Sequence, residues 1–412
     1  MDLNAELPRP LPFLNGVYVA VDAIPGSFLV VDGPYCVFTK AEMQYGHNIR
    51  CRLIPPLGRA AVVHTAVRTG MEEVTSLSSD RVAAVAGVFD RVCAYPEAEV
   101  VFATSFDFHE LLNFPLAAVA AEAGRRAGRL VCPIPSASLS GDWLEGYSRT
   151  CAALARGLPL SRGRGRRDTV AVVGYLYDRD EPDHRANLAE LKRLLAGLGL
   201  KLSSVWLSGS GPADLRKVAS ASALLSLPYA RDAARVLGRR LSARVVEVDL
   251  PLGLTATESF VRAVAGALGK EAQAERFLGR EVPAAVRDTK EHVVRVVSGR
   301  TAVLSVCDPH LRRGLLNLAS DLGLETASEP DGPRLPEADA RPLVIGSGRP
   351  AAGQAAGAGS VPAGIAVPFG YPNYEDHPVV ERPFLGFAGW RSLVEELAGR
   401  ILREEAAEEN RR

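Results

Sequence analysis

A cysteine at the predicted end of a buried strand is the residue of this sequence best placed to do chemistry. Cys36 ends the segment 30–36, in which an apolar run leads into a Gly33-Pro34 turn. In open α/β sheets, ligands gather outside the carboxyl ends of the strands. A thiolate at such a place can bind a soft metal centre such as an iron–sulfur cluster. The alternative interpretation is a cysteine that only packs, because free cysteine is among the most buried residue types.

Cys51 is the second cysteine with a chemical environment of its own. It lies between Arg50 and Arg52, and these basic neighbours favour a thiolate. Its spacing from Cys36 matches no standard zinc motif, and the sequence contains no Cys-x-x-Cys pair. The remaining cysteines are interpreted as packing residues, and they are Cys93, Cys132, Cys151 and Cys307.

No nucleotide-binding or hydrolase motif accompanies these cysteines. The sequence lacks a GxxxxGK[ST] phosphate loop, and Gly209-Ser210-Gly211 lacks the third glycine and the helix of a dinucleotide fingerprint. The GxSxG turn of α/β hydrolases is also absent. The residues by themselves therefore indicate a candidate metal ligand without specifying a reaction.

The elements expected to position Cys36 alternate between short apolar strands and amphipathic helices. Continuous apolar runs indicate strands buried on both faces, hence parallel sheets. Leucines recur at helical spacing in 187–195, before glycines that end a helix. This alternation predicts an α/β, doubly wound fold. The predicted strands include 100–103, 129–132, 169–173, 223–227, 243–248 and 301–306.

Two boundaries divide the chain into three α/β units of similar size. Residues 161–167 are basic and glycine-rich and are interpreted as an exposed linker, with an anion-binding strip as the alternative. A second boundary follows a long helical stretch that ends at Ser298-Gly299. The predicted domains are 1–165, 166–298 and 299–412.

Composition excludes several classes of protein. The 412 residues carry 48 Lys and Arg against 48 Asp and Glu, and 47% are hydrophobic, which is a globular profile. The balanced charge disfavours a nucleic-acid partner, and six cysteines are too sparse for a disulfide scaffold. The sequence contains no apolar run of about 18 residues or more, so it predicts no membrane-spanning helix. The amino-terminal residues do not resemble a secretory signal, so we expect a cytoplasmic protein.

Five segments in order along the chain resemble the nitrogenase component 1 family. This family includes the nitrogenase molybdenum–iron protein chains, their cofactor-assembly homologues and the light-independent protochlorophyllide reductase. The first segment, Gly33-Pro34-Tyr35-Cys36, is similar to the family's GPxGC turn, with Tyr35 in place of the second glycine. The others are 68–73, 135–147, 251–260, and 367–372 with 384–390.

The resemblance implies a fold of three Rossmann-like domains with parallel sheets around a central cleft. It also implies that Gly33, Pro34 and Cys36 form the site of an iron–sulfur cluster at a subunit interface. Members pair with a homologous sister subunit or a second copy, and a separate ATP-hydrolysing iron protein supplies electrons. Such a donor would explain why this chain has no phosphate loop of its own.

The sequence also departs from the family pattern. Catalytic chains carry three amino-terminal cluster cysteines, but residues 61–66 and 103–109 contain no cysteine near the second and third positions. Cys51 is a candidate for the second ligand through a shifted loop. A 4Fe-4S cluster shared between chains therefore fits better than an eight-iron cluster. Residues 203–207 contain no cysteine to hold an iron–molybdenum cofactor, so dinitrogen reduction by this chain is not expected.

The leading hypothesis is a subunit of a nitrogenase-like, two-component, ATP-dependent reductase acting on a small molecule. His109, Asp107 and Asp376 are candidates for proton delivery in its active site. The alternatives are a non-catalytic scaffold for metal-cofactor assembly and a cluster-free, three-domain ligand-binding protein. We also expect a dimer through the first domain, with the apolar stretch 106–121 either facing the partner or forming an ordinary core helix.

Overall fold

The computed structural model describes the chain in two compact units. The described residues are 11–38, 41, 61–65, 79–111, 113–161, 165–326, 341–346, 364–374 and 376–411. The first unit comprises Pro10–Asp180 and Lys201–Glu247, and the second comprises Met1–Arg9, Glu181–Leu200 and Val248–Arg412. The domain boundaries near 165 and 298 stay predictions.

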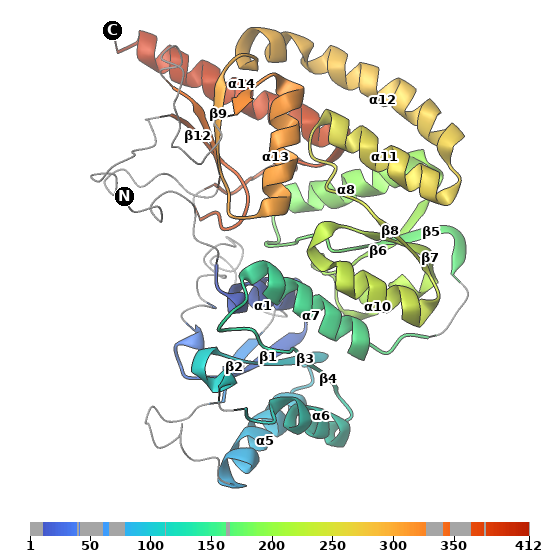
Figure 1. Ribbon diagram of the computed structural model, residues 1–412, viewed down its shortest axis with the longest axis vertical. Coiled ribbons are helices and arrows are strands. Elements are labelled where there is room, and N and C mark those ends of the chain that lie inside the picture. The colour runs from blue at the N-terminus through green and yellow to red at the C-terminus, as the bar shows by residue number, and fades with distance from the viewer. Residues whose placement is uncertain are drawn as a thin grey trace. The chain divides into compact units, whose positions relative to one another are not determined.

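The first unit contains a four-stranded parallel sheet (Figure 1), and Cys36 follows its strand β1 in the chain. Its strand order is β2-β1-β3-β4, so β1 lies inside the sheet between β2 and β3. Every residue of β1 from Leu29 to Asp32 is buried, as its continuous apolar sequence predicts. The strands are β2 (Ala61–His64), β1 (Ser27–Asp32), β3 (Val100–Ser105) and β4 (Leu130–Pro133).

Helices cover both faces of this first sheet. Figure 1 shows α5 and α6 on one side and α1 and α7 on the other. The helices α1 and α7 cross in backbone contact, because a Cβ on Gly16 would lie 1.6 Å from the carbonyl oxygen of Trp143. Glycine is therefore required at this crossing. The four helices are α1 (Phe13–Asp22), α5 (Ser79–Ala94), α6 (Leu116–Ala127) and α7 (Trp143–Gly157).

A second parallel sheet completes the first unit, in the order β6-β5-β7-β8. Arg240 on α10 donates to the carbonyl oxygen of Leu158 at 3.0 Å and also to that of Ala155, and so joins this part of the unit to the end of α7. The strands are β5 (Arg166–Val173), β6 (Lys201–Val205), β7 (Ala221–Ser226) and β8 (Arg244–Glu247). The helices are α9 (Pro212–Arg216) and α10 (Arg231–Leu241).

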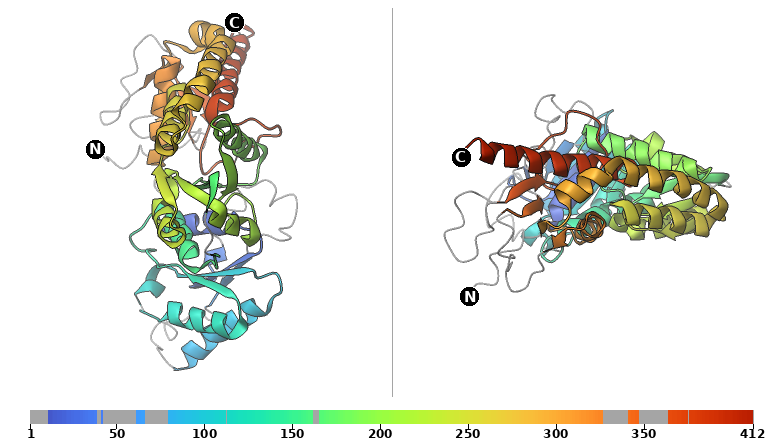
Figure 2. Two further views of the ribbon diagram at one scale, coloured as in Figure 1. Left: turned by 90° about the vertical axis from the view of Figure 1, so that its right-hand side faces the viewer. Right: turned by 90° about the horizontal axis from the view of Figure 1, so that it is seen from above.

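The second unit combines a third parallel sheet with long helices. The order of the sheet is β10-β9-β11-β12, and α12 and α14 run side by side (Figure 2). The strands are β9 (Thr301–Ser305), β10 (Glu325–Thr326), β11 (Leu343–Gly346) and β12 (Ile365–Pro368). The helices are α8 (Pro182–Gly197), α11 (Leu254–Leu268), α12 (Glu271–His292), α13 (Pro309–Leu322) and α14 (Gly386–Glu409).

Three parallel sheets flanked by helices confirm the predicted α/β fold class. The helix predicted at 187–195 lies within α8. None of the described helices combines the length and the apolar character needed to cross a membrane.

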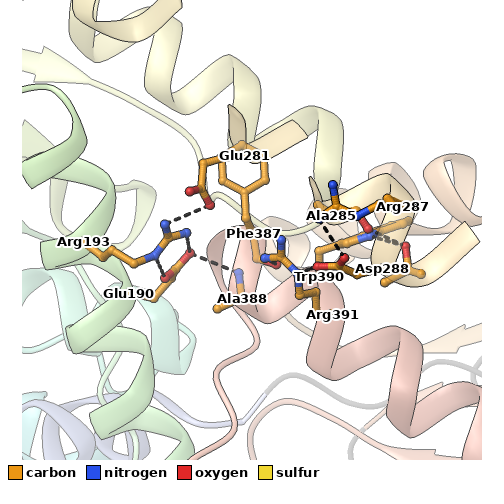
Figure 3. Close-up of polar contacts among 11 residues, drawn as sticks. Glu190, Arg193, Glu281, Ala285, Arg287, Asp288, Phe387, Ala388, Trp390 and Arg391 are labelled. Atoms are coloured by element: carbon orange, nitrogen blue, oxygen red, sulfur yellow. Dashed lines mark hydrogen bonds and ion pairs between the residues drawn. The ribbon is translucent and has the colours of Figure 1, made fainter. Parts of the chain in front are cut away.

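The start of α14 is held by side chains from α8 in the second unit. The Glu190 carboxylate accepts a hydrogen bond from the Ala388 amide at 3.1 Å, and Arg193 donates to the same carboxylate at 2.6 and 2.9 Å. Figure 3 shows Arg193 between Glu190 and Glu281, which it contacts at 2.8 Å. Glu190 thus supplies the helix cap that the residue before α14 does not provide.

Candidate functional site

Cys36 lies in a turn that follows β1 directly. The amide of Val37 donates to the carbonyl of Pro34 at 3.2 Å, and the amide of Phe38 donates to that of Tyr35 at 3.0 Å. We call residues 33–38 the Cys36 turn. The cysteine is exposed, so packing in the core does not account for it.

Two contacts fix the Cys36 turn against the first unit. A Cβ on Gly33 would lie 2.9 Å from the Cβ of Phe106, so the backbone approaches Phe106 too closely for another residue. On the other side, the Tyr18 hydroxyl of α1 donates to the Val37 carbonyl at 2.7 Å. The turn is thus held both by the chain after β3 and by α1.

A buried polar cluster lies at the carboxyl edge of the first sheet, beside the Cys36 turn. Asp32 ends β1 and has no exposed surface. Its carboxylate accepts hydrogen bonds from the Thr65 hydroxyl at 2.5 Å and from the Arg81 Nη2 at 2.8 and 3.0 Å. The His109 Nδ1 lies 3.5 Å from the same carboxylate and 3.3 Å from Arg81 Nη2. We call Asp32, Thr65, Arg81 and His109 the strand-edge cluster.

The strand-edge cluster stabilises a charged carboxylate inside the protein. Burial raises the pKa of Asp32, but hydrogen bonds with His109 and Thr65 and the charge of Arg81 outweigh it and hold that pKa below its ordinary value. The guanidinium of Arg81 also lies over the Phe114 ring, 4.8 Å from its centroid. Asp32 and Arg81 therefore form a compensated ion pair in the folded protein.

Two aromatic side chains of the Cys36 turn pack with the ring of His64 at the end of β2. Tyr35, Phe38 and His64 contact one another edge to face, with ring centroids 5.2 to 5.8 Å apart. The side chain of Tyr35 is 68% exposed. Two buried nitrogens nearby, His64 Nδ1 and Arg81 Nε, have no hydrogen-bond partner among the described residues.

The structure brings only part of the predicted proton-delivery set to this edge. His109 is 5% exposed and belongs to the strand-edge cluster. Asp107 begins the same 3-10 helix, η1 (Asp107–Glu110), but its side chain lies outside the described residues. Asp376 belongs to the second unit, where it pairs with Arg400 at 3.0 Å and its amide donates a hydrogen bond to the Asn373 Oδ1 at 3.1 Å. Asp376 thus belongs to a different compact unit from His109 and Asp107.

The apolar stretch 106–121 is interrupted. It contains η1 and then the start of α6, with Phe106 and Leu116 buried. Leu111 is 71% exposed, and Leu139, in the loop after β4, is 52% exposed. Glu110 links these two loops through hydrogen bonds from the Ser136 hydroxyl and the Leu139 amide at 3.1 and 3.4 Å. Part of this stretch is therefore core and Leu111 is exposed, while its contact with a partner stays a prediction.

The other described cysteines are poor candidates for a thiolate. Burial raises the pKa of Cys132 to about 12, and burial also raises the pKa values of Cys93 and Cys151 above the ordinary range. Cys307 is half-buried and belongs to the second unit. Cys51 lies outside the described residues. Within the described part of the chain, Cys36 is thus the exposed thiol, and no group of three or more His, Cys, Asp and Glu side chains could hold a metal ion there.

The sequence pattern does not identify Asp32, Thr65 or Arg81 as site residues. One signal was available, because a carboxylate that ends an apolar strand must be compensated when it is buried. That signal points to Asp32 but not to its partners, which come from 33 and 49 positions further along the chain.

The chain is similar to one protein family and to solved structures of nitrogenase components. The family model described as "Nitrogenase component 1 type Oxidoreductase" matches residues 14–328. A solved structure of nitrogenase Cp1 at pH 6.5 is similar over 97% of this chain and 93% of that chain, with a TM-score of 0.72 and 15% sequence identity. A structure of nitrogenase Cp1 at pH 5 is similar over 83% of this chain and 65% of that chain, with a TM-score of 0.57 and 11% identity. At these identities the structural likeness shows the fold alone.

Proposed function

Since the chain belongs to the nitrogenase component 1 type oxidoreductase family, we propose that it is a subunit of a two-component, ATP-dependent reductase. In this proposal Cys36 supplies a thiolate to an iron–sulfur cluster shared across a subunit interface. A separate ATP-hydrolysing iron protein delivers the electrons. The observation that carries the proposal is the exposed Cys36 thiol at the carboxyl end of β1, where ligands of open α/β sheets gather.

Among the described residues, Cys36 is the candidate ligand of such a cluster. A 4Fe-4S cluster is held by about four protein ligands, and Cys36 would supply one of them. The remaining ligands would come from Cys51 and from a sister subunit or a second copy of this chain. His64 Nδ1 and Arg81 Nε lack a hydrogen-bond partner within the described part of the chain, which supports a group bound near this edge, because buried polar atoms normally have partners. When bound, the cluster would accept and pass on single electrons.

Exposed apolar side chains in the loops that follow strands of the first sheet support a protein partner at this edge. Tyr35, Leu111 and Leu139 are each more than half exposed, and each lies in a loop after a strand of the first sheet. A partner that covers them would also shield a cluster from water. His109 and Asp107 remain candidates for moving protons at this edge, and Asp376 remains a candidate in the second unit.

The proposal is tested by iron content after anaerobic purification. We expect a coloured dimer or larger assembly with about four iron atoms per dimer, and Cys36→Ser should lose the iron and the visible absorbance. Cys307→Ser is the matched control, because it removes a thiol from the second unit, and it should keep the iron. Cys51→Ser tests the second candidate ligand in the same assay.

Each outcome of this experiment has a clear meaning. Unchanged iron content in Cys36→Ser, or a cluster-loaded monomer by sedimentation, would contradict the proposal. A colourless wild-type protein would favour the cluster-free ligand-binding alternative. If iron is present, turnover with an iron protein and ATP distinguishes a reductase subunit from a scaffold for cofactor assembly.

A further inference from the structure

Asp32 is close enough to Cys36 in the chain to determine where the Cys36 turn begins. It is the last residue of β1, and only Gly33, Pro34 and Tyr35 separate the two. Its backbone is fixed as well, because its carbonyl accepts a hydrogen bond from the Phe106 amide at 3.0 Å. A displacement of Asp32 would therefore be passed directly to the turn.

The Asp32 side chain depends on Arg81 for its place. Asp32 has no exposed surface, so its charge must be compensated inside the protein. Arg81 supplies that charge from α5, and a single nitrogen, Nη2, makes both contacts to the carboxylate. Without Arg81, the carboxylate would have to take up a proton or move toward water, and either change alters the start of the turn.

The rest of the turn is held by groups that do not involve Arg81. Gly33 packs against Phe106, and the Tyr18 hydroxyl holds the Val37 carbonyl. Loss of Arg81 should therefore disturb Pro34 and Tyr35, whose carbonyls accept the hydrogen bonds of the Val37 and Phe38 amides. The contacts of Gly33 with Phe106 and of the Val37 carbonyl with Tyr18 should remain. The effect should be local, because Val92 and its neighbours anchor α5 independently in the hydrophobic core.

We propose that Arg81 is a positioning residue for Cys36, which acts through Asp32 to fix the turn in the orientation that presents the thiol. The role of the thiol as a cluster ligand rests on the proposed function. The ordering of the turn by Arg81 does not depend on a bound group, so it can be measured on the protein without iron.

Hydrogen exchange on the full-length, iron-free chain tests this ordering. In Arg81→Met we expect the amides of Val37 and Phe38 to exchange about tenfold faster or more, while those of β3 change little. Arg81→Lys should restore protection in part, because one ammonium nitrogen can replace Nη2. Val92→Ala is the control on the same helix, since it weakens the core and leaves the Asp32 contacts in place. Thr65→Val, which removes one hydrogen bond to Asp32, gives a milder variant if Arg81→Met does not fold.

Iron binding then links the turn to its proposed ligand. After anaerobic reconstitution, Arg81→Met should hold less than half the wild-type iron or show an altered EPR spectrum, with recovery in Arg81→Lys. Wild-type exchange at Val37 and Phe38 in folded Arg81→Met, or in Thr65→Val if only that variant folds, would overturn the positioning role. Equal loss of protection in Val92→Ala would overturn it as well. Iron retained in Cys36→Ser would instead refute the proposed function and leave the exchange result standing.

Discussion

Two buried carboxylates, Asp32 in the first unit and Glu190 in the second, are each paired with arginine in different ways. Arg193 lies one helical turn from Glu190. Its side chain is 39% exposed, so water and Glu281 also compensate its positive charge. Arg81 lies 49 positions from Asp32 and is 13% exposed. The first pair caps a neighbouring helix, whereas the second compensates a charge at the edge of a sheet beside an exposed thiol.

This difference distinguishes an ion pair that only supports the fold from an ion pair that lies beside the candidate site. The Glu190 pair takes part in a helix cap, because its carboxylate also accepts the hydrogen bond of the Ala388 amide at the start of α14 (Figure 3). The Asp32 pair instead lies where β1, β2 and β3 end and α5 begins, near the Cys36 turn. Substitutions at the two carboxylates should therefore differ in size and in what they disturb.

The largest effect is expected for Asp32→Ala. It leaves the guanidinium of Arg81 buried without its counter-charge, so the free energy of unfolding should fall by about 3–5 kcal/mol. Urea unfolding followed by circular dichroism measures the change. The double variant Asp32→Ala with Arg81→Met should recover part of the loss, because it removes the uncompensated charge. A loss below about 1 kcal/mol for Asp32→Ala would contradict the strength of the pair.

Glu190→Ala should cost less, about 1–2 kcal/mol, which is the usual value of a lost helix cap. Arg193 keeps Glu281 and access to water, so no charge is left buried alone. Protection from hydrogen exchange should fall at the start of α14 and not in the Cys36 turn. The control is Asp288→Asn, because it weakens an exposed ion pair between Asp288 of α12 and Arg391 of α14 and should leave the midpoint of unfolding unchanged. Loss of protection at the Cys36 turn in Glu190→Ala would contradict the prediction that the two carboxylates act on different parts of the protein.

The smallest effect is a dependence of stability on pH that belongs to Asp32. Its pKa is lowered in the folded protein, while an unfolded aspartate titrates near about 3.9. The stabilisation is therefore complete above that value and is lost as the pH falls through the lowered folded pKa, at up to about 1.4 kcal/mol per pH unit. The difference in unfolding free energy between wild type and Asp32→Asn should shrink over this acidic range. A difference that stays constant there would show that Asp32 is not charged in the fold.

The sequence by itself determined the elements and the place of Cys36. Continuous apolar runs predicted the parallel strands, helical leucine spacing predicted α8, and the Gly33-Pro34 turn predicted a cysteine at a strand end. These are local signals, because periodicity and turn chemistry depend on neighbouring residues. The Glu190–Arg193 pair belongs to the same class, since residues three apart on a helix face each other.

Only the tertiary structure decided which distant residues meet. Thr65, Arg81 and His109 converge on Asp32 because the parallel strands β1, β2 and β3 end at one edge and α5 packs beside them. No local pattern encodes that meeting, because it follows from strand order and helix packing over tens of residues. Exposure was likewise decided by the fold, which buries Phe106 and leaves Leu111 and Cys36 outside. Burial depends on which residues pack against a side chain, and those residues come from distant parts of the chain.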